Sequence, residues 1–141
     1  MVRYVHANAL TLNGQGVLIR GASKSGKSSL TLALIGAAER AGQSASLVGD
    51  DRIGLRVSDG ALMASGHPRI AGMIEVRGAG IAHLSFTGEA RIVLVVDLVE
   101  TESSEGYDGF TTIENIDLRH LRLPARDTTE KMLQRITRVL K

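Results

Sequence analysis

A glycine-rich segment near the start of the chain, Gly21-Ala22-Ser23-Lys24-Ser25-Gly26-Lys27-Ser28, constrains the fold more than any other feature. It matches the phosphate-binding pattern G-x-x-x-x-G-K-[ST] at every fixed position. The apolar run GVLIR precedes it, and the Ala- and Leu-rich stretch SLTLALIGAAERAG follows it and ends near Gly42. This order predicts a strand, a phosphate-binding loop and a helix. We therefore expect an α/β protein that binds nucleotide phosphates at the start of this helix.

Two residues of the motif have expected roles in binding. Lys27 should reach the β- and γ-phosphates, and the Ser28 hydroxyl should bind Mg²⁺. The site also needs an acid, and two candidates compete. Asp50 and Asp51 end the short apolar run SASLVGDD, which a right-handed crossover would lay parallel to GVLIR. Asp97 ends RIVLVVD in the manner of a Walker B acid, but the apolar residues after it suggest that the strand continues, so the Asp50-Asp51 pair is favoured.

The composition excludes several classes of function. The 141 residues suit a single domain, residues 1–141, and no Cys is present to form a disulfide or a thiolate metal site. The net charge of +2, scattered Arg residues and 3% aromatic content do not suggest a nucleic-acid partner. No apolar run is long enough for a membrane span, and MVRYVHANAL lacks the plan of a signal peptide, so a cytoplasmic location without membrane association is expected.

The rest of the chain predicts mostly short strands and one more helix. RIGLRVS and ALMASG flank an Asp59-Gly60 hairpin turn, MIEVR and IAHLSF follow, and the β-branched run RIVLVVDLV predicts a central strand. The acidic, Ser- and Gly-rich stretch from Glu100 to Gly109 predicts an exposed loop. The last stretch, DTTEKMLQRITRVLK, predicts an amphipathic helix with Asp127 as its N-cap.

The segment Ile74-Glu75-Val76-Arg77-Gly78-Ala79-Gly80-Ile81 resembles the signature I-E-[VI]-R-G-x-G-I of the bacterial HPr kinase/phosphorylase family. In that family the signature follows a phosphate loop and an Asp-Asp pair in the same order. His6 ahead of GVLIR, LVGDDR and VLVVDL are further points of resemblance, so the likeness extends from about residue 4 to the final helix. It implies a P-loop kinase domain of the HPr kinase type, with a central sheet, flanking helices and an additional short-stranded β region.

The resemblance also implies roles for individual residues. Residues 21–28 would bind ATP, Ser28 and Glu75 would bind Mg²⁺, and Asp51 would be the general base toward a Ser hydroxyl of the phosphocarrier protein HPr or a nitrogen-branch homologue. In the reverse phosphorolysis, which releases pyrophosphate, Asp51 would act as the acid. His6 would lie close to the phosphates with Arg77 in the capturing loop. Independently of the resemblance, two adjacent acids can divide their roles, so that one of Asp50 and Asp51 faces the metal or a polar neighbour and the other faces the substrate. The family also implies a homo-hexamer.

Three departures from the family pattern limit these expectations. The chain resembles short forms that consist of the kinase domain alone, and Ser29 stands where the family commonly has an acid. The family's Tyr-Asp-Arg segment is Tyr107-Asp108-Gly109 here, so an active-site Arg is missing. Losing such a cation weakens the expectation of phosphorolysis more than that of kinase activity. Arg122 and Arg126 are candidate substitutes for it.

Two other functions remain open from the sequence. The first is a P-loop kinase for a small molecule, which would ordinarily bring an Arg-rich lid that is not evident here. The second is a nucleotide-binding regulatory module that has lost catalysis, for which Ser29 and Gly109 are the supporting features. The retention of His6 and Glu75 beside the two aspartates argues against lost catalysis. His67, His83 and His120 are assigned no role.

Overall fold

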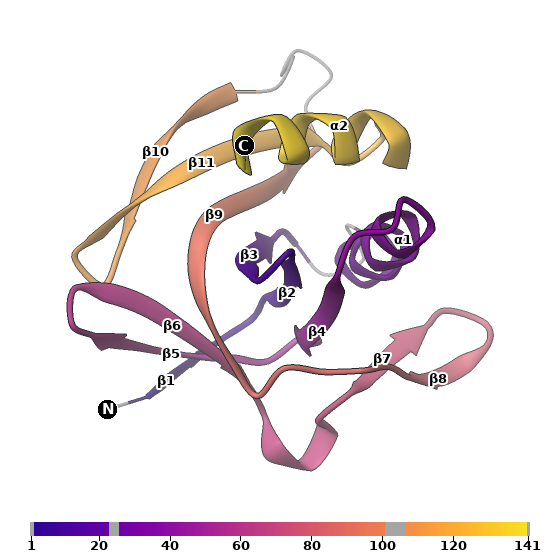
Figure 1. Ribbon diagram of the computed structural model, residues 1–141, viewed down its shortest axis with the longest axis horizontal. Coiled ribbons are helices and arrows are strands. Elements are labelled where there is room, and N and C mark those ends of the chain that lie inside the picture. Colours follow the sequence, from indigo (N-terminus) through magenta and orange to yellow (C-terminus); the bar gives the residue numbers. More distant parts are fainter. Residues whose placement is uncertain (1, 23–25, 101–106, 141) are drawn as a thin grey trace.

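The computed structural model of the protein describes residues 2–22, 26–100 and 107–140. A curled β-sheet forms most of it, and both helices lie against one face of this sheet (Figure 1). The helices are α1 (Lys27–Arg40) and α2 (Thr129–Leu140), with a short 3₁₀ turn η1 (Pro68–Ile70). The strands are β1 (Arg3–Val5), β2 (Asn8–Leu12), β3 (Gln15–Arg20), β4 (Ala45–Gly49), β5 (Ile53–Ser58), β6 (Ala61–Gly66), β7 (Met73–Val76), β8 (Gly80–His83), β9 (Glu89–Val99), β10 (Tyr107–Ile113) and β11 (Ile116–Pro124).

Strand β9 lies at the centre of the sheet and joins its two halves. Its first residues pair antiparallel with β6, and its later residues pair parallel with both β3 and β11. The full path runs β1-β5-β6-β9-β3-β2-β4; in addition β11 pairs with β9, and β10 pairs with β11. This position confirms the prediction that RIVLVVDLV forms a central strand, because only a strand paired along both edges can hold such a sheet together.

The curl of the sheet creates two apolar clusters, one on each face. The pairing of β9 with β3 shifts register between Ile92 and Leu94, so that Val93 is an extra residue in β9. The shift reverses which side chains face which side. Ile92 therefore packs in the cluster enclosed by β5 and β6, whereas Leu94 packs in the cluster that includes α1 and α2. Figure 1 shows β9 bending strongly along its length.

β4 is not the direct neighbour of β3 in the sheet, although the sequence suggested that it follows the phosphate-loop helix back beside that strand. β4 runs in the same direction as β3, as predicted, but β2 lies between them and pairs antiparallel with each. β2 and β3 form a hairpin around Asn13-Gly14, whose φ angles of 52° and 78° suit a two-residue turn. The Asn-Gly signal in ALTLNGQGVLIR was overlooked, and the Asp50-Asp51 pair consequently follows a strand that is one position farther from β3.

Two predictions near the end of the chain need correction. Residues 107–109 begin β10 and pair with β11, so they are not loop; residues 101–106 lie outside the described part of the chain. The amphipathic helix forms as predicted, but Thr128 caps it, because its hydroxyl accepts a hydrogen bond from the Lys131 amide at 3.2 Å. Asp127 instead accepts from the Thr128 amide at 3.1 Å. Within the described residues, neither helix has the length and apolar character needed to span a membrane.

Candidate active site

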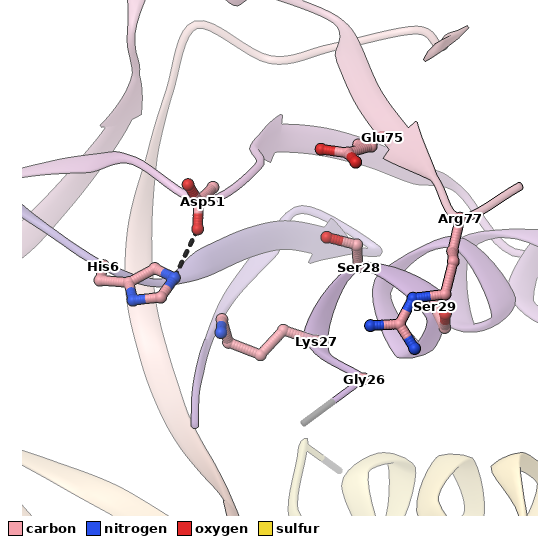
Figure 2. A pocket seen from close by; sticks show the side chains of 8 residues that line it. All are labelled: His6, Gly26, Lys27, Ser28, Ser29, Asp51, Glu75 and Arg77. Atoms are coloured by element: carbon pink, nitrogen blue, oxygen red, sulfur yellow. Dashed lines mark ion pairs between the residues drawn. The ribbon is translucent and has the colours of Figure 1, made fainter. Parts of the chain in front are cut away.

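A pocket of about 330 Å³ opens at the start of α1, where several separate segments meet (Figure 2). The turn before β2, the start of α1, the end of β4 and the β7–β8 hairpin each contribute side chains. The residues that line it are His6, Gly26, Lys27, Ser28, Ser29, Asp51, Glu75 and Arg77. Seven of these, all but Ser29, were expected at a site from the sequence. They come from positions up to 71 residues apart, and the fold brings them to one place.

The N-terminus of α1 presents groups that suit an anion. The first turn contains no acidic residue, and no side chain among those described caps it at Gly26. Its free amide groups and the positive end of the helix dipole therefore face the pocket. Lys27 donates to the carbonyl oxygens of Gly21 at 3.1 Å and Ala22 at 3.3 Å, which holds its amine beside the loop. Ser23, Lys24 and Ser25, also expected to bind phosphate, lie outside the described residues.

Asp50 is buried behind the pocket and ties its walls together. One carboxylate oxygen accepts from the Ser28 hydroxyl at 2.6 Å and from the Asn8 amide at 2.8 Å. The other oxygen accepts from the backbone amide of Glu75 at 3.0 Å. A single side chain thus joins β2, α1 and β7. Because the Ser28 hydroxyl donates its hydrogen to Asp50 and accepts only a long hydrogen bond of 3.5 Å from the Asn8 amide, one lone pair of that hydroxyl remains available to a cation.

Asn8 belongs to the same network and was missed by sequence reasoning. Its side chain is fully buried, donates to Asp50 and to Thr31 at 3.2 Å, and accepts from the backbone amide of Asp51 at 2.9 Å. Thr31 in turn donates to the carbonyl of Lys27 at 2.7 Å. Neither residue belongs to a motif. An Asn inside the apolar run HANALTL was the only available signal, because a buried amide must find partners.

Asp51 turns in the opposite direction from Asp50 and faces the pocket. Its φ of 69° places it in the left-handed region, which Asp tolerates better than most residues. The side chain is 66% exposed, and one of its oxygens lies 2.5 Å from Nε2 of His6. In the described part of the chain, nothing else pairs with this carboxylate. Its second oxygen is therefore open to a ligand in the pocket.

The β7–β8 hairpin covers one side of the site and carries Glu75 and Arg77. The Ala79 amide donates to the Val76 carbonyl at 3.0 Å, and Gly78 has a φ of 80°, as the third position of a type II turn requires. Ile74 anchors the hairpin, because it is only 1% exposed and packs in the cluster beneath α1. Figure 2 shows Arg77 reaching from the hairpin toward Ser29 at the start of α1.

Asp97, the competing candidate acid, lies within a polar cluster away from the pocket. β9 continues past it to Val99, as the sequence suggested. Both its oxygens accept from Arg20 at 2.8 Å, and His120 Nε2 lies 2.7 Å from one of them. Burial alone would raise the pKa of Asp97, but the hydrogen bonds from Arg20 and His120 and their charges outweigh it and hold this pKa below its usual value. Asp97 therefore joins β3, β9 and β11.

Several other residues singled out in the sequence lie outside the pocket lining. Arg122 is exposed on β11, opposite Asp97, and Arg126 follows that strand. Neither arginine lines the pocket, and Gly109 on β10 does not line it either. His67 caps the 3₁₀ turn by accepting from the Arg69 amide at 3.2 Å. His83 is exposed at the end of β8.

The chemistry of the pocket fits a magnesium–nucleotide complex. The Ser28 hydroxyl and the Glu75 carboxylate are oxygen ligands of the kind that Mg²⁺ prefers. Among the described residues, no three His, Asp or Glu side chains gather closely enough to hold a metal by themselves. Mg²⁺ characteristically takes one or two protein ligands and completes its shell with phosphate and water, so this donor set fits a metal that arrives with a nucleotide.

The curled sheet, the N-terminus of α1 and the carboxylates beside it define an α/β protein with a candidate phosphate-binding site. Comparisons with known proteins identify it further. The family model described as HPr Serine kinase C-terminal domain matches residues 1–132. The chain therefore belongs to this family, as the IEVRGAGI segment indicated.

Individual relatives agree with this assignment. The HPr kinase/phosphorylase of Clostridium kluyveri is 33% identical over 135 residues, and that of Enterococcus faecalis is 31% identical over 136 residues. Each match covers 86% of this chain but 42% of the relative, so the chain spans less than half the length of these curated proteins. A solved structure, the Hpr(Ser) kinase/phosphatase from Coxiella burnetii, superposes with a TM-score of 0.79 at 26% identity, covering 97% of each chain.

Proposed function

We propose that this protein is a cytoplasmic, ATP- and Mg²⁺-dependent kinase that phosphorylates a serine of the phosphocarrier protein HPr or of a nitrogen-branch homologue. The observation that supports this most is the convergence of Asp51 and His6 with Lys27 and Ser28 in one pocket. A phosphate cradle alone would serve any nucleotide-binding protein. An exposed carboxylate held across the pocket from that cradle adds the group that a hydroxyl acceptor requires.

Bound Mg²⁺–ATP would supply the transferable γ-phosphoryl group and neutralise the charge that develops on it. Lys27 and the first-turn amides of α1 would bind the phosphate oxygens, and Ser28 with Glu75 would hold the metal. The open oxygen of Asp51 would accept the proton of the acceptor serine as its oxygen bonds to phosphorus. His6, 2.5 Å from the other oxygen, would keep the carboxylate oriented toward the acceptor.

The reverse reaction uses the same residues. An oxygen of inorganic phosphate would bond to the phosphorus of the phosphoserine, the serine oxygen would leave, and protonated Asp51 would return the proton to it, releasing pyrophosphate. Because Gly109 replaces an expected Arg and neither Arg122 nor Arg126 lines the pocket, we propose that phosphorolysis is the slower direction. The family resemblance also supports a homo-oligomer, a hexamer, which light scattering of the purified protein tests.

The deciding experiment is transfer of labelled γ-phosphate from ATP to purified HPr in the presence of Mg²⁺. We expect label on a serine of HPr with the wild-type protein. Asp51→Asn should lower the rate by about 10²- to 10⁴-fold, the usual contribution of a general base. Asp59→Asn is the matched control, because it makes the same chemical change in an exposed turn where Asn is equally suited.

Two results would contradict these expectations. Absence of label on HPr with a folded, ATP-binding wild-type protein would contradict the kinase function. Equal loss of activity in Asp59→Asn would show that the effect of Asp51→Asn is not specific to the site. Adding inorganic phosphate to labelled phospho-HPr and measuring pyrophosphate tests the reverse direction separately.

A further inference from the structure

A second hollow of about 330 Å³ adjoins the site and shares the His6–Asp51 pair with it. The remaining lining differs completely: Lys27 and Ser28 belong to the first pocket, whereas Tyr4, Val5 and Arg52 line the second. The pair therefore forms a wall between a hollow that holds the phosphate loop and a hollow that does not.

Arg52 presents an unused cation in this second hollow. Its guanidinium carbon lies 5.2 Å from the centre of the Tyr4 ring, a distance typical of a cation–π contact. Arg3, Arg20 and Arg56 each pair with a carboxylate, but no carboxylate in the described part of the chain pairs with Arg52. Stacking fixes one face of the guanidinium, while its in-plane N–H donors remain available to a ligand.

The backbone fixes the position of Arg52 relative to Asp51. The left-handed turn at Asp51 is held by the hydrogen bond from its amide to Asn8, and the Arg52 amide donates to the Asp50 carbonyl at 2.8 Å. On the other side, the ring of His67 lies 5.6 Å from that of Tyr4 and supports it. The cation and the proposed base therefore belong to one ordered turn.

We infer that this second hollow seats the segment of the acceptor protein that carries the phosphorylated serine, and that Arg52 binds a carboxylate on that segment. The inference rests on the proposed kinase function. In phosphoryl transfer the attacking and leaving oxygens are roughly in line, so acceptor and nucleotide approach from opposite sides of the transferred group. Asp51 lines both hollows. Lys27 and Ser28 line the first one, so the nucleotide would bind there. The second offers Arg52, whose guanidinium matches a carboxylate in a bidentate pair.

The test compares Arg52→Gln with the wild type in the labelling reaction, with Mg²⁺–ATP and purified HPr each varied. We expect the KM for HPr to rise by about 10-fold or more, the usual effect of losing a hydrogen bond to a charged partner, while the KM for ATP stays within about twofold. Added salt should raise the KM for HPr of the wild type toward that of the variant. Arg40→Gln is the control, because it removes the same charge at the C-terminal end of α1, a helix about 20 Å long whose other end forms the pocket, and it should change neither constant.

Tyr4→Leu provides a second variant that does not alter the charge. Leu keeps an apolar contact but removes the aromatic face, so the KM for HPr should rise by a smaller factor. An unchanged KM for HPr in Arg52→Gln would overturn the inference, and so would a rise confined to the KM for ATP.

Failure of the proposed function is distinguishable from failure of this inference. If the wild type leaves HPr unlabelled, the kinase function fails, and titration calorimetry of HPr against the wild type and Arg52→Gln then decides the second question. Binding that weakens about 10-fold in Arg52→Gln supports the hollow as the HPr site. Equal binding, or none to either protein, overturns it.

Discussion

Asp50 and Asp51 are adjacent in the chain, yet their carboxylates occupy opposite surroundings. Asp50 is 7% exposed and accepts three hydrogen bonds, whereas Asp51 is exposed and has one neighbour, His6. The left-handed turn at Asp51 creates this difference, because it reverses the direction of the second side chain. Asp50 therefore holds the walls of the site together, whereas Asp51 can contact a substrate.

Asn8 stabilises this arrangement, and its removal should destabilise the protein. Asn8→Ala leaves the Asp51 amide without its side-chain acceptor and takes one donor from buried Asp50. We expect the free energy of unfolding to fall by about 2–3 kcal/mol, measured by urea denaturation. Thr112→Ala is the control, because it removes an exposed hydrogen bond to Asp117 and should cost less than about 1 kcal/mol. Equal losses in both variants would contradict the importance of the buried network.

Asp97 should give the stability a specific dependence on pH. Its pKa is lower in the folded protein than in the unfolded chain, so the ionised carboxylate stabilises the fold above its ordinary pKa of about 4. This contribution disappears as the pH falls through the lower, folded value. Asp97→Asn should therefore be less stable than the wild type at pH 7, by about 2 kcal/mol or more, and the difference should shrink as the pH falls below about 4. Urea denaturation at several pH values measures it, and a difference that stays constant with pH would contradict this account.

At the scale of elements, the β7–β8 hairpin links sequence to site most directly. Gly78→Ala puts a Cβ at a φ of 80° where no atom lies within 4 Å, so the cost is backbone strain of about 1–2 kcal/mol rather than a clash. Because the turn aims Arg77 and the strand carries Glu75, we expect a rise in the KM for ATP together with this loss of stability. Gly88→Ala is the matched control, since its site is equally open and its φ is ordinary. An unchanged KM in Gly78→Ala would show that the hairpin does not position the nucleotide.

Elements with a local signal were predictable from the sequence, and those defined by distant pairing were not. β3, α1 and β9 each carry their own pattern, and all three are present in the structure. β11 buries Leu118, Leu121 and Leu123, but charged residues stand between them, and its place in the sheet comes from parallel pairing with β9, so it was not predicted. In the same way, Lys27, Ser28 and Glu75 were named from motifs and line the pocket. Asn8 was missed because its side chain bonds to four partners that are 20 to 43 positions away.

At the scale of the whole molecule, the two halves of the sheet meet at the register shift in the pairing of β3 with β9. Gly16 lies at this shift, and a Cβ there would stand 2.3 Å from the Arg91 carbonyl oxygen. No side-chain movement relieves a clash with backbone, so Gly16→Ala must separate β3 from β9. The separation would disturb both apolar clusters at once, because β9 contributes to each.

We therefore expect Gly16→Ala to lower the free energy of unfolding by at least about 2 kcal/mol, the scale of overpacking in a core. The same change at Gly36, inside α1, should instead raise it by about 0.5–1 kcal/mol, because Ala favours the helix and the new Cβ meets only the flexible end of Arg40. Thermal and urea unfolding of the two variants measure this contrast. If both variants shifted stability in the same direction, the close approach of β3 to β9 would not be what closes the sheet.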